Sequence, residues 1–377
     1  MTNYSYQISN ISGNRILWID TAKAIGIFLV FYGHLIEPLI NTDDAVFLQF
    51  KFVNSFHMPF FFFVSGFFFK RNLKPLQRVK TLFLRRIVPV FAFAILLLPF
   101  WIGKEVIFSS TPNWGIILHK AIQYVKGNPG LDVITWFLVC LFTAEILALF
   151  IHFIFKSRIA IVIIGIISLI FGLFICDHIY FVMRVTHIPR NFWYAHESLI
   201  ALGFYLIGYF LFPIIRDLKV NYIMIAFYTL ICFLILLFTY NLNNPYGDFF
   251  MSMYNSFHGN FIWFLIDAFS GTFFIIFLSK LIPSKKILLF FGQSTLLLLG
   301  LNGIFHHFIN NEISVIYSQN INVLLLTAYS VILTAISLLL CYFPIKFLNK
   351  YFPQLFGKPF LNGPILSNFE NREKNIG

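Results

Sequence analysis

Charged residues are scarce in this sequence. They make up 11% of its 377 residues, whereas hydrophobic residues make up 59%, and the mean hydropathy is +0.82. A soluble domain needs roughly a quarter of its residues charged to cover its surface. The scarcity therefore excludes a soluble globular protein and predicts an integral membrane protein. The apolar runs are continuous and about 20 residues long, which favours membrane-spanning helices over an alternating β-barrel.

Several common functional motifs are also missing. The four cysteines lie singly in apolar runs, without a CxxC pair or a cysteine–histidine ligand spacing. We interpret them as small buried hydrophobic residues. The sequence has no Walker loop, dinucleotide fingerprint, HExxH or GxSxG pattern. These absences argue against a nucleotide-driven pump, a zinc peptidase and a serine hydrolase, and we predict no metal site.

The apolar runs predict an all-α integral membrane protein with a bundle of about ten transmembrane helices. The predicted spans are 16–40, 53–70, 82–102, 134–155, 159–177, 197–215, 221–240, 261–282, 287–309 and 321–345. The longest loops between them, at 103–133, 178–196 and 241–260, are too short to form an independent core.

Basic residues are unevenly distributed over the predicted loops. Twenty of the 27 lysines and arginines fall on one side of the bundle, which the positive-inside rule places in the cytoplasm together with both termini. We predict a cytoplasmic N-terminal tail over 1–15, a transmembrane domain over 16–345 and a basic cytoplasmic C-terminal tail over 346–377. The net charge of +12 then reflects topology and contact with the lipid bilayer, and we expect no nucleic-acid partner.

Ionisable residues interrupt the first span, in the stretch "DTAKAIGIFLVFYGHL". Lys23 and His34 share one helix face, about 16 Å apart along the axis, and Asp20 and Glu37 lie one turn beyond them. Such groups cost about 2.5–3.5 kcal/mol each at membrane depth, so they usually face a bundle interior or a wet cavity. Two simpler interpretations are also possible. The Lys23 side chain extends to the cytoplasmic membrane surface beside Asp20, and His34 is a hydrogen-bonded interior histidine.

Three stretches, "WIDTAKAIGIFLVFYGHL", "SFHMPFFFFVSGFFFKR" and "RRIVPVF", resemble acyltransferase family 3. These membrane-bound O-acyltransferases act on bacterial surface polysaccharides and related glycans, and include fucose 4-O-acetylase-like proteins. The resemblance is weaker over later stretches, among them "FFGQSTLLLLGLNGIFHHF". It implies that His34 is the catalytic histidine and that acetyl-CoA is the acyl donor.

The resemblance also indicates residues for the donor. Many relatives carry arginine at the position of Lys23, and lysine keeps the charge but loses the bidentate fork. Arg85 and Arg86 match a basic pair of the family and are candidates for binding the coenzyme phosphates, with ordinary positive-inside charge as the alternative. Ser65 lacks the surroundings of a nucleophile, so we predict that it either lines the cofactor site or packs against a neighbouring helix. Gly66 beside it allows close approach of another helix.

Transfer of an acyl group to a hydroxyl needs a base, and histidine suits this task near neutral pH. We therefore predict His34 as general base. Glu37, one turn away, is a candidate for orienting His34 and for binding the acceptor. His57, near the outer end of the second span, is a candidate for binding the acceptor. Interfacial structural roles are the alternatives for both residues.

The predicted function is a multi-pass O-acetyltransferase of the cell (inner, cytoplasmic) membrane. It moves an acetyl or similar short acyl group from acyl-CoA to a hydroxyl of a surface polysaccharide or of its lipid-linked precursor. A transporter or exporter of a glycan or small solute is the alternative, and an inactive member of a glycan assembly complex is a third. Within the spans, we expect Glu145 and Asp267 to face the interior, and Gln293 and Asn302 are further interior polar candidates. Further histidines on the outer side are His178, His187, His196, His258, His306 and His307.

Overall fold

The computed structural model describes residues 11–12, 15–69, 75–108, 112–244, 249–317 and 322–369. Its long helices are α1 (Leu17–Ile36), α5 (Val88–Phe108), α7 (Trp136–Ile154), α8 (Arg158–Asp177), α10 (Ala195–Arg216), α11 (Tyr222–Thr239), α12 (Phe261–Leu281) and α16 (Val323–Leu340). The shorter α-helices are α2 (Asp44–Asn54), α3 (His57–Gly66), α4 (Pro75–Leu82), α6 (Trp114–Ile122), α9 (Ile179–Thr186), α13 (Lys286–Gln293), α14 (Thr295–Phe308), α15 (Asn310–Tyr317) and α17 (Tyr342–Tyr351).

The remaining regular structure is short. The single-turn elements are η1 (Glu37–Leu39), η3 (Gln123–Lys126), η4 (Val133–Thr135) and η5 (Met253–Asn255), together with the π-helical turn η2 (Phe83–Ile87). The strands β1 (Ile11–Ser12) and β2 (Arg15–Ile16) form a small antiparallel pair, with Ile11 opposite Ile16.

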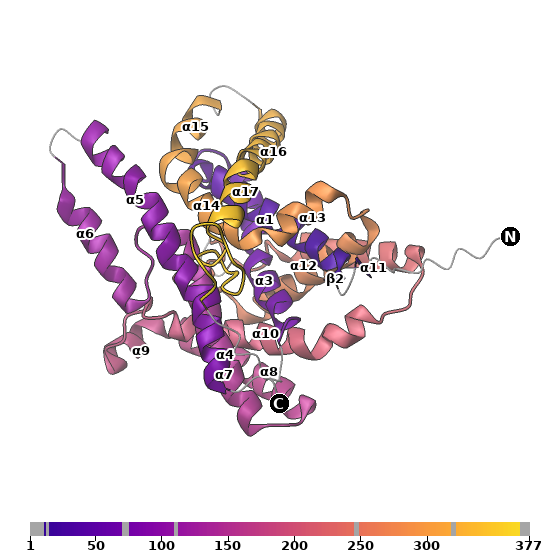
Figure 1. Cartoon of the computed structure of the whole chain (residues 1–377). Coiled ribbons are helices and arrows are strands. Elements are labelled where there is room, and N and C mark those ends of the chain that lie inside the picture. The colour runs from indigo at the N-terminus through magenta and orange to yellow at the C-terminus, as the bar shows by residue number, and fades with distance from the viewer. Residues whose placement is uncertain are drawn as a thin grey trace.

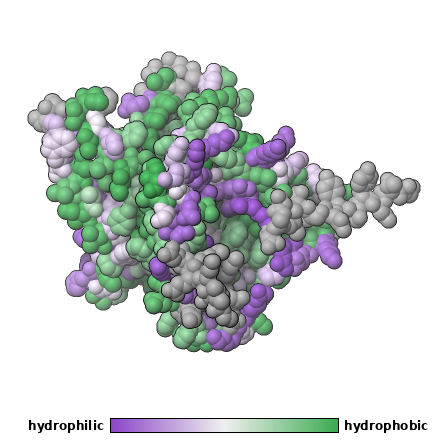
Figure 2. Space-filling model, in the orientation of Figure 1, coloured by the Kyte–Doolittle hydropathy of each residue, from purple (hydrophilic) through white to green (hydrophobic). Residues whose placement is uncertain are grey.

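The protein has an all-α membrane fold, as predicted. Within the described residues, eight helices or helix runs are long and apolar enough to cross a membrane. The pair α13–α14, which is bent by 79°, adds a ninth if it counts as one span. The number of spans is therefore lower than the predicted ten or so. Hydrophobic side chains cover most of the face in Figure 2, whereas hydrophilic ones gather around α17 and the segment that follows it.

The predicted span 53–70 is wrong as a continuous helix. It is divided between the end of α2 and the whole of α3, whose 10 residues extend only about 15 Å, half the hydrocarbon thickness of a bilayer. The side chains of Asn54 and Ser55 hydrogen-bond to backbone carbonyls at 2.9 and 2.8 Å. These local bonds compete with the helical ladder, so α2 ends there.

The predicted span 287–309 is also not a straight helix. It breaks at Ser294, where α13 ends and α14 begins. Gly292, just before the break, lies so close to α1 that an added Cβ would overlap the backbone carbonyl of Asp20. The bend therefore keeps the end of α13 on α1 while α14 takes a new direction.

Two helices organise the interior of the bundle. α1 packs against α12, α13, α14 and α16, whereas α10 packs against α3, α7 and α8. The phenylalanine-rich helix α3 lies inside, and Phe60, Phe62 and Phe63 are completely buried. The phenylalanine run is therefore part of the protein core and not a lipid-facing surface.

The crossing of α3 and α10 depends on two glycines. An added Cβ at Gly66 would overlap the carbonyl oxygen of Tyr205, and one at Gly208 would overlap the carbonyl oxygen of Phe63. The prediction that Gly66 allows close helix approach is therefore confirmed.

We expect Gly66→Ala and Gly208→Ala each to destabilise the fold, by roughly 1–3 kcal/mol, because backbone atoms must move apart to admit the methyl group. The measurement is the thermal unfolding midpoint of the purified protein in detergent. Gly103→Ala is the matched control, since an added Cβ at this helical glycine meets nothing within 4 Å. Equal midpoints for all three variants would show that the crossing relaxes without cost.

The bundle has two ends. At what we call the basic end, the ammonium of Lys280 donates to the carbonyl of Ile215 at 2.6 Å and lies 4.9 Å from the ring centre of Trp18. At the far end, the backbone N–H of Trp193 donates to the carbonyl of Lys126 at 2.9 Å. Figure 1 shows β2 and α13 at one side of the bundle, and α6 and α9 at the other.

Candidate active site

The ionisable stripe of α1 begins in an ion-pair network at the basic end. The buried carboxylate of Asp20 accepts a hydrogen bond from Arg15 Nε at 2.6 Å and lies 3.2 Å from Lys23 Nζ. Gln293 Nε2 donates to the same carboxylate at 3.4 Å. Lys23 is therefore held by Asp20, and its side chain is only 17% exposed.

Lys23 also lines a cavity of about 160 Å³, which we call the inner cavity. Arg86 and Ser65 line the same cavity, so three of the four predicted cofactor-binding residues come together. The remaining wall is mostly apolar: Ile27, Val30, Met58, Phe61, Val64, Phe68, Phe137, Leu138, Leu141, Thr295, Leu296 and Leu299. The cavity is a largely apolar slot with two cations and two hydroxyls.

Arg86 is fixed by a carboxylate from the neighbouring helix α7. Its Nε and Nη2 donate to the two oxygens of Glu145 at 2.9 and 3.0 Å, a bidentate pair, and the glutamate side chain is 4% exposed. Arg86 belongs to the π-helical turn η2, and such turns occur often at functional sites. The prediction that Glu145 faces the interior is confirmed.

Arg85 points elsewhere. Its guanidinium lies 5.2 Å from the ring centre of Phe360, in the segment after α17, and it does not line the inner cavity. Neighbouring helical residues project about 100° apart, and here the two side chains of the basic pair diverge.

The predicted residues of α3 lie in two places. The Ser65 hydroxyl donates to the carbonyl of Phe61 at 2.7 Å, one turn back, while the side chain borders the inner cavity. His57 is buried at the start of the helix, where its Nδ1 lies 2.8 Å from the carbonyl of Val53. His57 does not line the inner cavity or either of two depressions at the far end of the described part of the chain.

At the far end, His34 belongs to a cluster of three ionisable side chains. His34 Nδ1 lies 3.1 Å from Glu37 Oε2, and His306 Nδ1 lies 3.5 Å from the same oxygen. The two imidazole rings are 4.9 Å apart between centres. Asn310 closes the cluster, because its Nδ2 donates to the backbone carbonyl of His34 at 2.8 Å. The spacing argument that placed Glu37 beside His34 is therefore correct.

His307 continues this cluster away from α1. Its ring lies 4.8 Å from that of His306 and 5.3 Å from that of Trp101. Its Nε2 accepts a hydrogen bond from the backbone N–H of Val133 at 3.4 Å. Sequence reasoning missed the contact of His306 with Glu37. The available signal was that "FHHF" ends one of the stretches that resemble the family.

A family model described as an acyltransferase domain matches residues 16–342. The chain belongs to acyltransferase family 3. It is therefore a multi-pass membrane acyltransferase, and the predicted resemblance is confirmed. Searches of curated proteins and of solved structures find no match.

In this acyltransferase, two groups of described side chains could hold a metal ion, although we predicted no metal from the sequence. One group is His34, Glu37 and His306, and the other is Cys176, Glu197 and His258. In each group the donor atoms lie within 4.8 Å of one another, which suits Zn²⁺ ligation. The second group is buried, and His258 Nε2 lies 2.9 Å from Glu197 Oε1, so it also joins the segment 249–260 to α10.

Of the other polar residues predicted within spans, Asp267 and Asn302 are buried, whereas Gln293 is exposed. Asp267 accepts a hydrogen bond from the Thr239 hydroxyl at 2.5 Å. Asn302 is completely buried in α14, and Gln293 reaches Asp20 as described above. Burial of Asp267 and Asn302 keeps these polar groups away from lipid, where exposing them would be costly.

Proposed function

We propose that this acyltransferase transfers an acetyl or similar short acyl group from acyl-CoA to a hydroxyl of a surface polysaccharide or of its lipid-linked precursor, in the cytoplasmic membrane of the cell. One observation carries the proposal. Along α1, the inner cavity extends from Lys23 to Val30, and His34 follows one turn later, about 6 Å further along the axis. A slot with two cations in its wall thus extends toward a histidine that can act as a base.

The charges around the inner cavity suit an anionic donor. Among the described residues, the cations Arg15, Lys23 and Arg86 form ion pairs with two carboxylates, those of Asp20 and Glu145. The positive-inside rule places this end in the cytoplasm, where acyl-CoA is made. The cavity is smaller than the 300–1,000 Å³ usual for a whole small ligand. We therefore propose that the slot takes the thioester arm, while the nucleotide stays at the basic surface.

The proposed chemistry uses the contact between His34 and Glu37. The carboxylate faces Nδ1, so it favours the tautomer that carries hydrogen on Nδ1 and leaves Nε2 free to accept a proton. The acceptor hydroxyl loses its proton to Nε2 as its oxygen attacks the thioester carbonyl. The tetrahedral intermediate collapses, the ester forms, and the coenzyme leaves as its thiolate, which takes up the proton. Here Glu37 positions His34 and does not itself react.

The test is a transfer assay with purified protein in detergent, acetyl-labelled acetyl-CoA and candidate saccharides. We expect label in an alkali-labile ester on the saccharide. Surface glycans isolated with and without the gene should differ by the mass of the acyl group, which also identifies the acceptor. An unchanged glycan mass, together with no labelled ester in vitro, would falsify the proposal.

Lys23 tests how the donor binds. We expect Lys23→Ala to weaken binding of acetyl-CoA by about tenfold or more, because a charge-assisted contact is worth roughly 1.5–3 kcal/mol. Lys23→Arg should keep most of the affinity, since the charge remains. The measurement is the Kd of acetyl-CoA by calorimetry. Equal affinities in all three proteins would mean that Lys23 serves only its ion pair with Asp20.

An exporter is the second candidate, because the broken pair α13–α14 resembles the discontinuous helices of carriers. In this molecule, however, Gln293 beside the break hydrogen-bonds to Asp20, and Thr295 on its other side lines the inner cavity. The break thus contributes to the same slot that the transfer proposal uses. If glycan export continues in a His34→Ala strain while no ester is ever detected, the exporter is favoured.

A further inference from the structure

Two depressions at the far end of the bundle share lining residues. The first, of about 430 Å³, is lined by η3, α9 and the segment 189–192. The second, of about 710 Å³, is lined mainly by α6, the segment 128–133, Tyr254 and His307. Gln123 and Asn128 line both depressions, so we call the two together the outer groove.

The outer groove ends at the histidine cluster. His307 lines the groove, its ring is 4.8 Å from His306, and His306 is 4.9 Å from His34. On the same helix, Leu299 lines the inner cavity, about 12 Å from His307 along the axis. The inner cavity and the outer groove therefore approach the histidines from opposite ends of the bundle.

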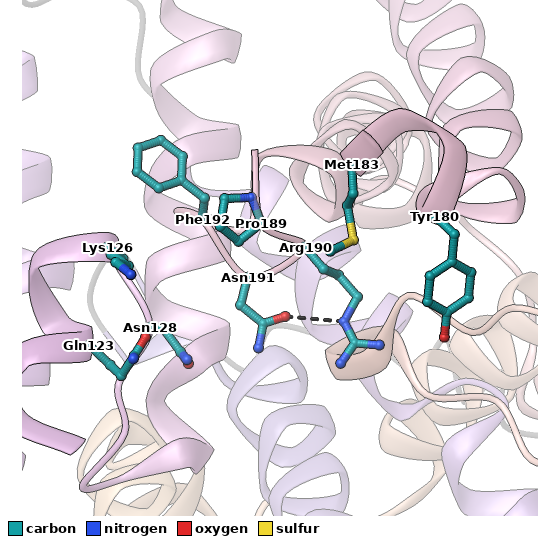
Figure 3. Close-up of a pocket in the computed structure, with 9 residues that line it drawn as sticks. All are labelled: Gln123, Lys126, Asn128, Tyr180, Met183, Pro189, Arg190, Asn191 and Phe192. Carbon is teal, nitrogen blue, oxygen red and sulfur yellow. Dashed lines mark hydrogen bonds between the residues drawn. The ribbon is translucent and has the colours of Figure 1, made fainter. Parts of the chain in front are cut away.

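Cations line the groove without acidic partners. Lys126 and Arg190 lie in the first depression and Lys120 in the second, and no described lining residue carries a carboxylate. Figure 3 shows the side chain of Arg190 between those of Asn191 and Tyr180, with Lys126, Gln123 and Asn128 across the depression. The groove therefore presents positive charge together with amide and phenol groups.

Arg190 is held in place by neutral groups. Its Nη1 and Nη2 donate to the backbone carbonyl and the side-chain oxygen of Asn255 at 3.1 and 3.2 Å, and its Nε donates to Asn191 Oδ1 at 3.3 Å. A guanidinium has five N–H donors, so two stay without a partner among the described residues. The side chain is thus oriented, but its charge is not neutralised.

Lys120 lies close to a second cation. Its ammonium is 4.3 Å from the ring centre of Trp101, and that of Lys104 is 5.6 Å from the same ring. Burial, and then the charge of Lys104, lower the pKa of Lys120. One acidic residue, Asp132, lies in the chain between the groove residues Gly130 and Val133. It is completely buried, and burial raises the pKa of its carboxyl well above the usual range. Asp132 lines neither depression.

We propose that the outer groove binds the acceptor, and that this acceptor is an anionic saccharide chain lying from Arg190 past Lys126 and Lys120 to His307. The inference rests on the proposed function, because it places the acceptor hydroxyl beside the histidine cluster. Carboxylates of uronic acids and phosphates along the chain share the required chemistry. The amide side chains of Gln123, Asn128 and Asn191 supply hydrogen bonds for neutral hydroxyls, and the combined groove has room for several sugar units.

The test measures binding without donor, in nanodiscs of zwitterionic lipid. The fluorescent probes are hexagalacturonate, phosphorylated maltohexaose and neutral maltohexaose. We expect an anionic probe to bind about tenfold more tightly than maltohexaose at low salt, and this difference to shrink as salt screens the charges. The anionic probe that binds identifies carboxylate or phosphate as the group recognised. Equal binding of all three probes overturns the inference.

A pair of double variants localises the binding. Lys126→Gln/Arg190→Gln should lower the affinity for the anionic probe about tenfold, to that of maltohexaose. The matched control Lys219→Gln/Lys286→Gln removes the same charge from exposed positions at the basic end and should bind as the parent does. Equal losses in both double variants contradict the proposal.

His34→Ala separates this inference from the proposed function. The variant should bind the anionic probe normally, because His34 does not line the groove. If no ester is ever formed but anionic binding depends on Lys126 and Arg190, the groove proposal stands while acyl transfer to this acceptor fails. If neutral saccharides are acylated as well as charged ones, only the groove proposal fails.

Discussion

His34→Ala is expected to lower the rate of acyl transfer by about 10²–10⁴-fold, the range associated with loss of a general base. The protein should still fold, because the His34 side chain is partly exposed and Asn310 bonds only its backbone carbonyl. The measurement is kcat for ester formation at saturating acetyl-CoA, with the thermal midpoint recorded in parallel. His178→Ala is the matched control, since His178 is half exposed and its contacts are with the nearby residues Asp177, at 3.6 Å, and Phe174.

Two neighbouring substitutions distinguish the proposed mechanism from a metal site. Glu37→Gln should reduce kcat less than His34→Ala does, because the amide still orients the ring but no longer supports a positive imidazolium. If His34, Glu37 and His306 instead hold an ion, purified protein should contain about one equivalent of metal, and His306→Ala should lose it. Full activity in His34→Ala would exclude both roles for this histidine.

The second large effect concerns the buried pair of Arg86 and Glu145. Glu145→Ala leaves the guanidinium unpaired inside the bundle, and breaking one partner of such a pair typically costs 3–5 kcal/mol. We therefore expect a large fall in the thermal midpoint of the purified protein. Glu312→Ala, at an exposed position of α15, should leave the midpoint unchanged.

A double variant separates stability from function at this pair. Arg86→Met/Glu145→Leu removes both charges and should recover most of the stability, since apolar replacements of buried pairs are often neutral. Binding of acetyl-CoA should not recover, because the cation of the inner cavity is gone. Recovery of both properties would contradict a role for Arg86 in donor binding and leave it a structural residue.

Sequence reasoning succeeded where the signal was local. The helical spacing placed Lys23 at one end of a stripe and His34 at the other, and it predicted the contact of Glu37 with His34, because residues three apart share a helix face. It failed where local polar bonds end helices. Asn54 and Ser55 divide a predicted span, and the break at Ser294 divides another. A hydropathy average over a whole segment does not register a helix end caused by one or two residues, so both segments were predicted as ordinary spans.

The sequence by itself determined that this protein is an all-α membrane protein of acyltransferase family 3, because composition, hydropathy and one conspicuous motif are local properties. Only the tertiary structure decided which polar residues meet. Arg86 turns to Glu145 and the inner cavity while Arg85 turns away, and His306 reaches Glu37 from a helix more than 260 residues further along the chain. Such meetings depend on how α1, α7 and α14 cross, and this is set by close packing throughout the bundle and not by the spacing within any one helix.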